Sequence, residues 1–265
     1  MSGVGISIWY PENPQAGSAL DPDAAAFVAR MTVQPSPARA GLIETLIKTL
    51  KSGGVWPKLD ILYLTAAHDS QAARLNLLNG SSTLAPMNSP AFTVDRGYTG
   101  DGSSSYLDTG YDTLVGPQLQ RDSCSIGVYT NTDPGAADTR EFGSRLHNVG
   151  AYDLTQKMIF RSSATNSNST VTTMASGLGL SSSTRNSAGS FSAYRNGAFV
   201  ESVSRPSVVP LSTTAVMCAW NNNGTISNFS NRRIAAAFAG AGMTDAEMLA
   251  LCNAIKDYLT AIGAN

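Results

Sequence analysis

The sequence predicts a mainly β protein, a two-sheet antiparallel sandwich with a helical pair before it and one helix after it. Three observations predict this fold. Short apolar segments recur at fairly regular spacing beyond residue 90 and are separated by polar turns. The 265 residues are 42% hydrophobic but only 14% charged, which is typical of a β domain with Ser-, Asn- and Gly-rich loops. Helix start and stop signals cluster near the two ends of the chain.

The chain divides into three parts in this interpretation. Residues 1–20 form an N-terminal arm and linker, residues 21–55 a helical lead-in, and residues 56–265 the sandwich with its C-terminal helix. The arm carries an apolar patch, followed by two prolines and a Gly-Ser stretch; the patch consists of Ile6, Ile8, Trp9 and Tyr10. Such a patch either docks on a partner chain or adds an edge strand to its own domain. Both interpretations stay open.

Two helices are expected after the arm. Asp21-Pro22 and Ser36-Pro37 each place a capping side chain before a proline, which is a typical helix start. The second helix has apolar residues at helical spacing on one face and ends at the glycine pair 53–54. At the other end of the chain, Thr244-Asp245-Ala246-Glu247 is a capping-box pattern ahead of an apolar stripe. Each of these stripes is a face to bury.

Strands are expected from residue 58 onward. Residues 58–65 are apolar on both faces, which indicates a strand between the helices and a core. Asn196-Gly197, between two apolar runs, is the clearest hairpin signal in the chain. The expected strands beyond residue 90 are 91–95, 105–109, 123–130, 157–161, 190–194, 198–203, 215–220 and 232–239. The serine-rich runs 162–173 and 176–189 are interpreted as exposed loops or edge strands.

The composition also excludes some classes of partner. With 18 basic and 19 acidic residues, the formal charge of −1 gives no reason to expect nucleic acid or an anionic membrane. The 3 cysteines are widely spaced and odd in number, so we interpret them as small buried residues. No secretory leader or membrane-spanning run is apparent, so we expect a protein that is made in a cytoplasm and stays soluble.

Catalytic motifs are missing from the sequence. A sandwich glucanase needs two carboxylates that converge on one glycosidic bond, and the glutamates here are scattered. His68 and His147 have no zinc-ligand spacing and are interpreted as surface or loop histidines. Phosphate loops, dinucleotide fingerprints and nucleophile elbows do not occur. We therefore expect a protein that is not an enzyme.

Two kinds of binding residue remain as candidates. Asp101 and Asp108 could offer oxygen ligands to Ca²⁺, or they serve a turn and a strand end; otherwise we expect no cofactor. Exposed aromatic rings can stack on sugars, although aromatic residues of sandwiches are often in the core. The candidates for carbohydrate binding are Tyr98, Tyr106, Tyr111, Tyr152 and Trp220.

Three segments carry a resemblance to a known family. They are DRGYTGDGSSSYLDTGYD (95–112), YRNGAFV (194–200) and FSNRRIAAAFAGAGMTDAEMLAL (229–251), and residues 21–77 look like the helical lead-in of the same proteins. Together they resemble the concanavalin A-like lectin/glucanase (LamG-like) domains of tail and other virion proteins of phages and prophages. The resemblance covers nearly all of the chain from Asp21 onward.

The resemblance implies a jelly-roll sandwich in a virion, made in the bacterial host. The leading hypothesis is a non-enzymatic phage structural protein, a tail-fibre or capsid-surface module, which attaches to other virion proteins through Ile6, Ile8, Trp9 and Tyr10 and forms a homo-oligomer on the particle. The alternative is a domain that binds, or degrades, a host-surface glycan. A cellular lectin-like protein is a third hypothesis. The arm and the polar loops between residues 162 and 189 are the expected functional surfaces.

Overall fold

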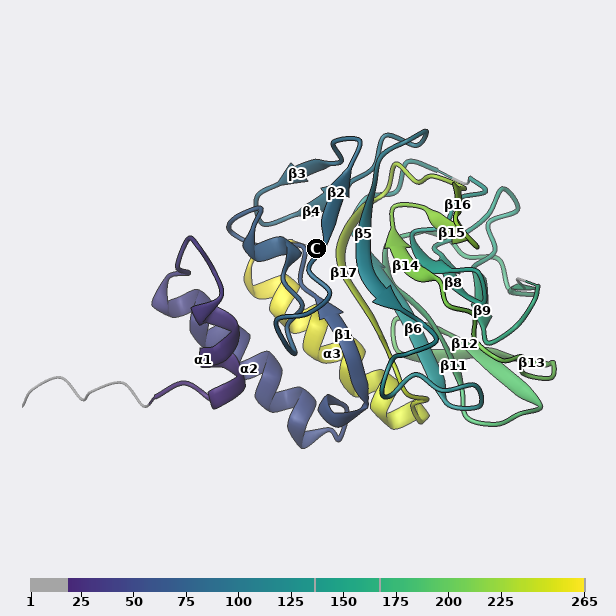
Figure 1. The fold of residues 1–265 in the computed structure, drawn as a ribbon, viewed down its shortest axis with the longest axis horizontal. Helices are drawn as coiled ribbons and strands as arrows, with labels where there is room; N and C mark the ends of the chain where they lie inside the picture. The colour runs from purple at the N-terminus through teal and green to yellow at the C-terminus, as the bar shows by residue number, and fades with distance from the viewer. Residues whose placement is uncertain (1–18, 136, 167, 265) are drawn as a thin grey trace, which may run out of the picture.

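The computed structural model describes residues 19–135, 137–166 and 168–264. Two sheets pack against each other, and three α-helices lie on one side of the sandwich (Figure 1). The helices are α1 (Pro22–Ala29), α2 (Pro37–Ser52) and α3 (Asp245–Ala261), with short 3₁₀ turns η1 (Trp56–Lys58) and η2 (Ala72–Arg74). None of the helices in the described part of the chain is long and apolar enough to cross a membrane.

The first sheet, here called the helix-side sheet, has 8 strands in the order β13-β12-β11-β6-β17-β4-β3, with β1 also paired to β17. All of its pairings are antiparallel. Its strands are β1 (Leu59–Tyr63), β3 (Ala91–Thr93), β4 (Gly97–Thr99), β6 (Cys124–Thr130), β11 (Gly179–Arg185), β12 (Ser190–Arg195), β13 (Ala198–Ser204) and β17 (Arg233–Gly240).

The second sheet, here called the far sheet, has 9 strands in the order β10-β9-β8-β7-β14-β5-β2, with the hairpin β15–β16 attached to β7. Its strands are β2 (Ala85–Met87), β5 (Tyr106–Asp112), β7 (Phe142–Ser144), β8 (His147–Gly150), β9 (Ile159–Ser162), β10 (Asn168–Ser169), β14 (Thr214–Met217), β15 (Trp220–Asn222) and β16 (Thr225–Ser227). The predicted two-sheet sandwich with N-terminal helices and a C-terminal helix is confirmed.

The helices begin where the capping signals predict. Asp21 and Ser36 are the N-caps of α1 and α2, and a proline follows each of them in the first turn. Thr244 caps α3, and the Glu247 carboxylate accepts a hydrogen bond from the backbone N–H of Thr244, which completes the capping box. Each cap satisfies N–H groups that the first turn of a helix leaves without an intrahelical partner.

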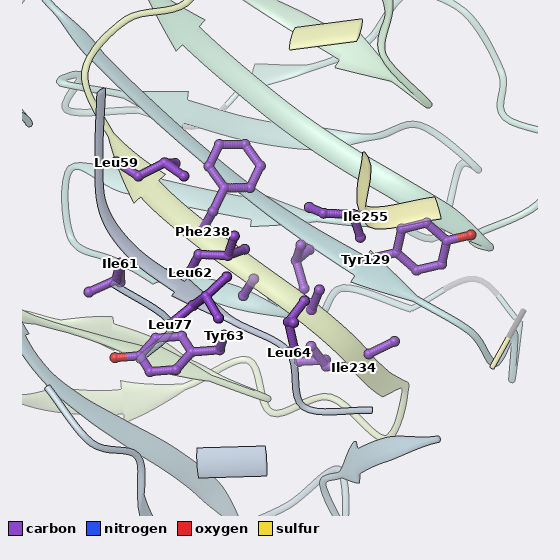
Figure 2. Close-up of a cluster of buried hydrophobic side chains, with 14 of the residues drawn as sticks. Leu59, Ile61, Leu62, Tyr63, Leu64, Leu77, Tyr129, Ile234, Phe238 and Ile255 are labelled. Carbon is purple, nitrogen blue, oxygen red and sulfur yellow. The ribbon is translucent and has the colours of Figure 1, made fainter. Parts of the chain in front are cut away.

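The outer face of the helix-side sheet is buried under the helices. Leu62 of β1 pairs with Phe238 of β17, and both lie in the apolar cluster that Ile255 of α3 joins (Figure 2). The Phe238 ring needs Gly127 on the neighbouring strand, because a Cβ there would lie 2.3 Å from the ring. The predicted strand near residues 58–65 is buried on both faces for this reason.

One sequence-based interpretation is wrong. The run 176–189 does not form an exposed loop or edge strand, because β11 lies inside the helix-side sheet between β6 and β12 and every residue of it is buried. Its hydroxyl groups find partners in the core: Ser183 bonds Ser162 of the far sheet at 2.8 Å, and Ser182 contacts the sulfur of Met248 in α3. The polar composition of this segment is therefore why the sequence did not predict a central strand there.

Candidate functional site

A cavity of about 410 Å³ lies between the helix-side sheet and α3, and we call it the helix-side pocket. Its volume falls in the range of small-molecule sites, which are typically about 300–1,000 Å³. The lining residues are Tyr129, Thr130, Asn131, Leu178, Gly179, Asn196, Cys252, Asn253 and Lys256. The pocket thus joins four parts of the chain: the end of β6, the start of β11, the β12–β13 turn and the exposed side of α3.

The hairpin turn places one amide at the pocket. Asn196 and Gly197 have φ values of 50° and 79°, the left-handed pair that a tight hairpin of this kind needs. The Oδ1 atom of Asn196 accepts a hydrogen bond from the backbone N–H of Leu180 at 2.9 Å. Gly179 makes this contact possible, because a Cβ on Gly179 would lie 2.1 Å from that oxygen. The confirmed hairpin signal is therefore also part of the pocket.

A second amide, that of Asn131, is held by the β3–β4 turn and by the segment after α3. The Nδ2 atom of Asn131 donates to the carbonyl oxygens of Arg96 and Ala264 at 2.8 and 2.9 Å. Its Oδ1 atom accepts from Nε of Arg233 at 2.8 Å. The Asn131 side chain is thus fixed in one orientation and is a rigid wall of the pocket.

The α3 wall offers groups that can reach a ligand. Asn253 and Lys256 are exposed, one helical turn apart at most, and supply an amide and an ammonium group. Cys252 is buried, and burial raises the pKa of its thiol to about 11, so the sulfur is an apolar surface rather than a thiolate. Tyr129 lies beside Ile255 with its hydroxyl pointing away from the apolar cluster (Figure 2).

The strand start that forms the sheet-side wall is tied down by an acidic side chain. Asp133 accepts hydrogen bonds from the Tyr152 hydroxyl at 2.5 Å, from Ser176 at 2.8 Å and from the N–H of Gly177 at 2.9 Å. Burial raises the pKa of Asp133, but these hydrogen bonds outweigh it and hold that pKa below its usual range. The segment before Leu178 is therefore fixed by an ionised carboxylate at neutral pH.

A buried ion pair supports this corner from inside. Arg232 and Glu141 are both fully buried, and their Nη1 and Oε1 atoms are 3.1 Å apart. The guanidinium of Arg232 also lies 4.7 Å from the centre of the Tyr152 ring. Tyr152 is thus held between a cation on its face and the Asp133 carboxylate at its hydroxyl, which links the ion pair to the pocket wall.

The aromatic residues predicted to bind sugar are divided between core and surface. Tyr98, Tyr111 and Tyr152 are 3%, 6% and 4% exposed, and their hydroxyls bond Ser70, Asp60 and Asp133. Burial of this kind leaves these three rings little surface on which a sugar could stack. These three tyrosines are core residues, which is the alternative that the sequence had left open.

Tyr106 and Trp220 remain partly exposed on the far sheet. The Tyr106 ring lies 6.4 Å from that of Phe229, and the Trp220 indole N–H donates to the carbonyl oxygen of Ser144 at 2.8 Å. Of the five predicted sugar-binding residues, only Tyr106 and Trp220 keep exposed ring surface on which a sugar could stack. The structure does not bring them to the helix-side pocket, whose lining includes neither.

The two weak calcium candidates serve local backbone turns. Asp101 accepts hydrogen bonds from the backbone N–H groups of Ser103, Ser104 and Ser105, which hold its pKa far below the usual range. Asp108 accepts one from Gly110 at 3.0 Å. In the part of the chain that the structure describes, no three His, Cys, Asp or Glu side chains gather as a metal site would need.

His147 is not a surface residue: it is fully buried in β8, and its Nε2 atom lies 3.0 Å from the Ser163 hydroxyl. The predicted attachment residues, Ile6, Ile8, Trp9 and Tyr10, lie outside the described residues. All 3 cysteines are free and buried, as predicted.

The pocket residues on α3 and at the end of β6 were not predicted from the sequence. Asn253 and Lys256 lie on the polar side of a helix, where such side chains are ordinary, and only the folded arrangement places them beside Asn131. The one signal available was the hairpin at Asn196, which marked a turn and not a site.

No family model and no curated protein matches this chain. Solved structures do match. The Trypanosoma rangeli sialidase in complex with 2,3-difluoro-KDN shares 9% identity with a TM-score of 0.51, over 80% of this chain and 39% of the sialidase. A botulinum neurotoxin type C structure, whose cell entry is described as dependent on two ganglioside molecules, shares 10% identity with a TM-score of 0.50, over 74% of this chain and 51% of that one.

This likeness concerns the fold. The chain spans less than two thirds of the sialidase and toxin chains that it matches. At such low identity the comparison shows that this chain has the same kind of two-sheet β-sandwich as these structures.

Proposed function

We propose that this protein is a glycan-binding module without catalytic activity and that the helix-side pocket is its sugar site. The observation that carries the proposal is the pocket itself: the amide of Asn253 and the ammonium group of Lys256 line one cavity, whose other walls are the fixed amides of Asn131 and Asn196 and an apolar surface at Leu178. Sugars present hydroxyl groups beside apolar C–H faces, and a pocket of mixed amides and apolar surface meets both requirements.

The fold comparison supports this choice among binding functions. Both matched structures are described together with a sugar, either as a bound sugar derivative or as gangliosides on which entry depends. Function belongs to the site and not to the fold, so the comparison raises the expectation of a sugar ligand, while the pocket residues carry the argument.

The chemistry of the pocket favours binding over hydrolysis. Hydrolysis would need two carboxyl groups close to one glycosidic bond. Lining residues of the helix-side pocket include no Asp or Glu, and the Cys252 thiol is protonated at neutral pH because burial raises its pKa to about 11. The role of a virion component that attaches through residues 1–20 stays a separate prediction, as does the virion location.

The test is a glycan array of neutral and acidic oligosaccharides, followed by calorimetric titration of the best binder. Lys256→Ala and Asn253→Ala should each weaken binding about tenfold, because each removes one polar contact worth roughly 1.5 kcal/mol. Lys48→Ala on α2 is the matched control, since Lys48 is an exposed helical lysine outside the pocket. An array without binding, or a titration unchanged by both pocket variants, would overturn the proposal.

A further inference from the structure

Arg161 of β9 lies on the face of the far sheet that is turned away from the helices, and three further arginines from neighbouring connections surround it. The inner row of this sheet runs through Phe142, Val149 and Phe160, and Phe160 packs against Phe191 of the other sheet at 5.4 Å. The adjacent row, from Asn148 to Arg161, must then point outward, because side chains alternate along a strand. Strands β8, β9, β15 and β16 lie on the side of the molecule away from the helices (Figure 1).

Arg161 is central to this group and is poorly satisfied. It is 7% exposed, and its guanidinium makes one hydrogen bond to the described residues, from Nη1 to the carbonyl oxygen of Arg145. Its Nε atom is buried without a partner. A buried N–H group without a hydrogen-bond partner costs free energy, and native proteins rarely leave one in that state.

The charges around Arg161 have the same sign. Burial, followed by the repulsion of Arg140, Arg145 and Arg205, lowers the pKa of Arg161 to about 10. Within the described part of the chain, the four guanidinium groups share one ion pair, between Arg140 and the exposed Asp138. This group of arginines is therefore a positive region inside a protein of formal charge −1.

An indole ring completes the region. The guanidinium of Arg161 lies 5.2 Å from the centre of the Trp220 ring, whose N–H donates to the carbonyl oxygen of Ser144. Asn222, two residues after Trp220 in β15, accepts a hydrogen bond from Arg145 at 2.8 Å. The β15–β16 hairpin and the β7–β8 turn thus hold an aromatic surface beside the uncompensated arginines.

We propose that this face, around Arg161 and Trp220, is a second binding site, which takes the carboxylate or sulfate group of an acidic glycan. Arginine presents N–H donors in a planar fork that matches either oxyanion, and a partly exposed indole offers a surface to the sugar ring that carries it. The site rests on the proposed glycan-binding function, but it shares no residue with the helix-side pocket.

The experiment titrates the full chain with two pairs of acidic and neutral glycans and with inorganic sulfate, at low and moderate salt. Oligogalacturonate and its methyl ester test a carboxylate, a heparin-derived hexasaccharide and its desulfated form test a sulfate, and inorganic sulfate tests a bare anion. We expect at least tenfold tighter binding of one acidic form than of its neutral partner, weakened by salt.

Arg161→Gln and Trp220→Ala should each reduce that binding at least tenfold, whereas Arg121→Gln, at an exposed arginine outside both sites, should leave it unchanged. Arg161→Lys, which keeps a charge, and a thermal melt of every variant separate lost binding from lost folding. Equal binding of acidic and neutral forms, no effect of Arg161→Gln in a folded protein, or binding of inorganic sulfate alone would overturn the second site. Loss of neutral-sugar binding in Lys256→Ala would still support the pocket in any of these cases.

Discussion

Replacing Arg232 by methionine is the most direct test of how the pocket corner is held. Methionine is similar in length and can still pack on the Tyr152 ring, but it removes the cation that faces Glu141 at 3.1 Å. Both side chains of the pair are fully buried. Removing one member of a buried pair typically costs about 3–5 kcal/mol, because a buried charge is left uncompensated. Loss of the hydrogen bond from Arg232 to Thr139 adds to this cost.

Hydrogen bonds that remain on Glu141 reduce the cost of losing Arg232, and a double variant can measure how much of that cost comes from the unpaired charge. Glu141 keeps hydrogen bonds from Thr139 at 2.7 Å, from Ser230 at 2.8 Å and from the N–H of Ala151. We therefore expect Arg232→Met to lower the free energy of unfolding by about 4 kcal/mol, near the middle of the usual range. Glu141→Gln keeps the shape of the acceptor without its charge, so the double variant should recover at least about 2 kcal/mol of that loss.

Urea unfolding of the wild type, both single variants and the double variant closes the cycle. Tyr152 links the ion pair to Asp133, so Arg232→Met should also loosen the Gly177 segment and weaken ligand binding in the pocket. A cost below about 1 kcal/mol for Arg232→Met, or strictly additive single effects, would refute the reasoning, because the pair would then be uncoupled.

Three other expectations follow from single residues. Burial and two neighbouring arginines lower the pKa of His147 to about 3, so below pH 6.5 the unfolded chain binds a proton that the folded chain does not. The free energy of unfolding should therefore fall by up to about 1.4 kcal/mol per pH unit as the pH drops from about 6.5 toward 3. Urea unfolding of the wild type and a His147→Gln variant between pH 7 and 4 measures this fall, and equal pH dependences of the two proteins would contradict it. Thr244→Ala removes the capping hydroxyl of α3 and should cost about 1 kcal/mol in the same assay, with Thr244→Ser as the neutral control. Gly97→Ala places a Cβ 1.9 Å from the carbonyl oxygen of Ile234 at a φ of 117°, so we expect the melting temperature to drop by about 8 °C or more. A melting temperature within about 2 °C of the wild type would show that the β4–β17 contact is not as close as described.

Much of the fold could be predicted because local signals and tertiary structure agree. The caps at Asp21, Ser36 and Thr244 act within one turn of helix, so no distant residue is needed to interpret them. The strand at 124–130 alternates in sequence as a strand should, and Asn196-Gly197 has few conformations other than a tight hairpin. These are features whose physical cause lies within a few residues.

β11 and His147 show where such reasoning fails. The segment GLSSSTR contains one large apolar residue, yet it is a central strand, because its hydroxyls are satisfied by other elements, including Ser162 and Met248, which lie 21 and 66 residues away in sequence. His147 was predicted to lie on the surface or in a loop, but it is buried in a strand of the far sheet beside Ser163. A polar residue is buried when distant partners satisfy it, and the sequence does not name those partners.

The candidate sites could not be predicted for a related reason. Lys256 is an ordinary polar residue on a helical wheel. It lines a pocket together with Asn131, 125 positions earlier, only because α3 packs where β6 ends. Trp220 was singled out as an aromatic residue, but its position over Arg161 depends on the register between β7, β8 and β9. Sequence suggested the residue types, and strand order determined which of them meet.

The two proposed sites lie on outer faces of different sheets, and this separation constrains what each can do. The helix-side pocket lies against α3, whereas Arg161 points outward from the far sheet, so the interior of the sandwich separates them. Packed sheets are about 10 Å apart, which a single sugar ring cannot span together with both layers of side chains. A small ligand must therefore occupy one site or the other. Only a polymer that wraps around the edge of the sandwich could engage both, and its gain in affinity would depend on effective concentration and not on any contact between the sites.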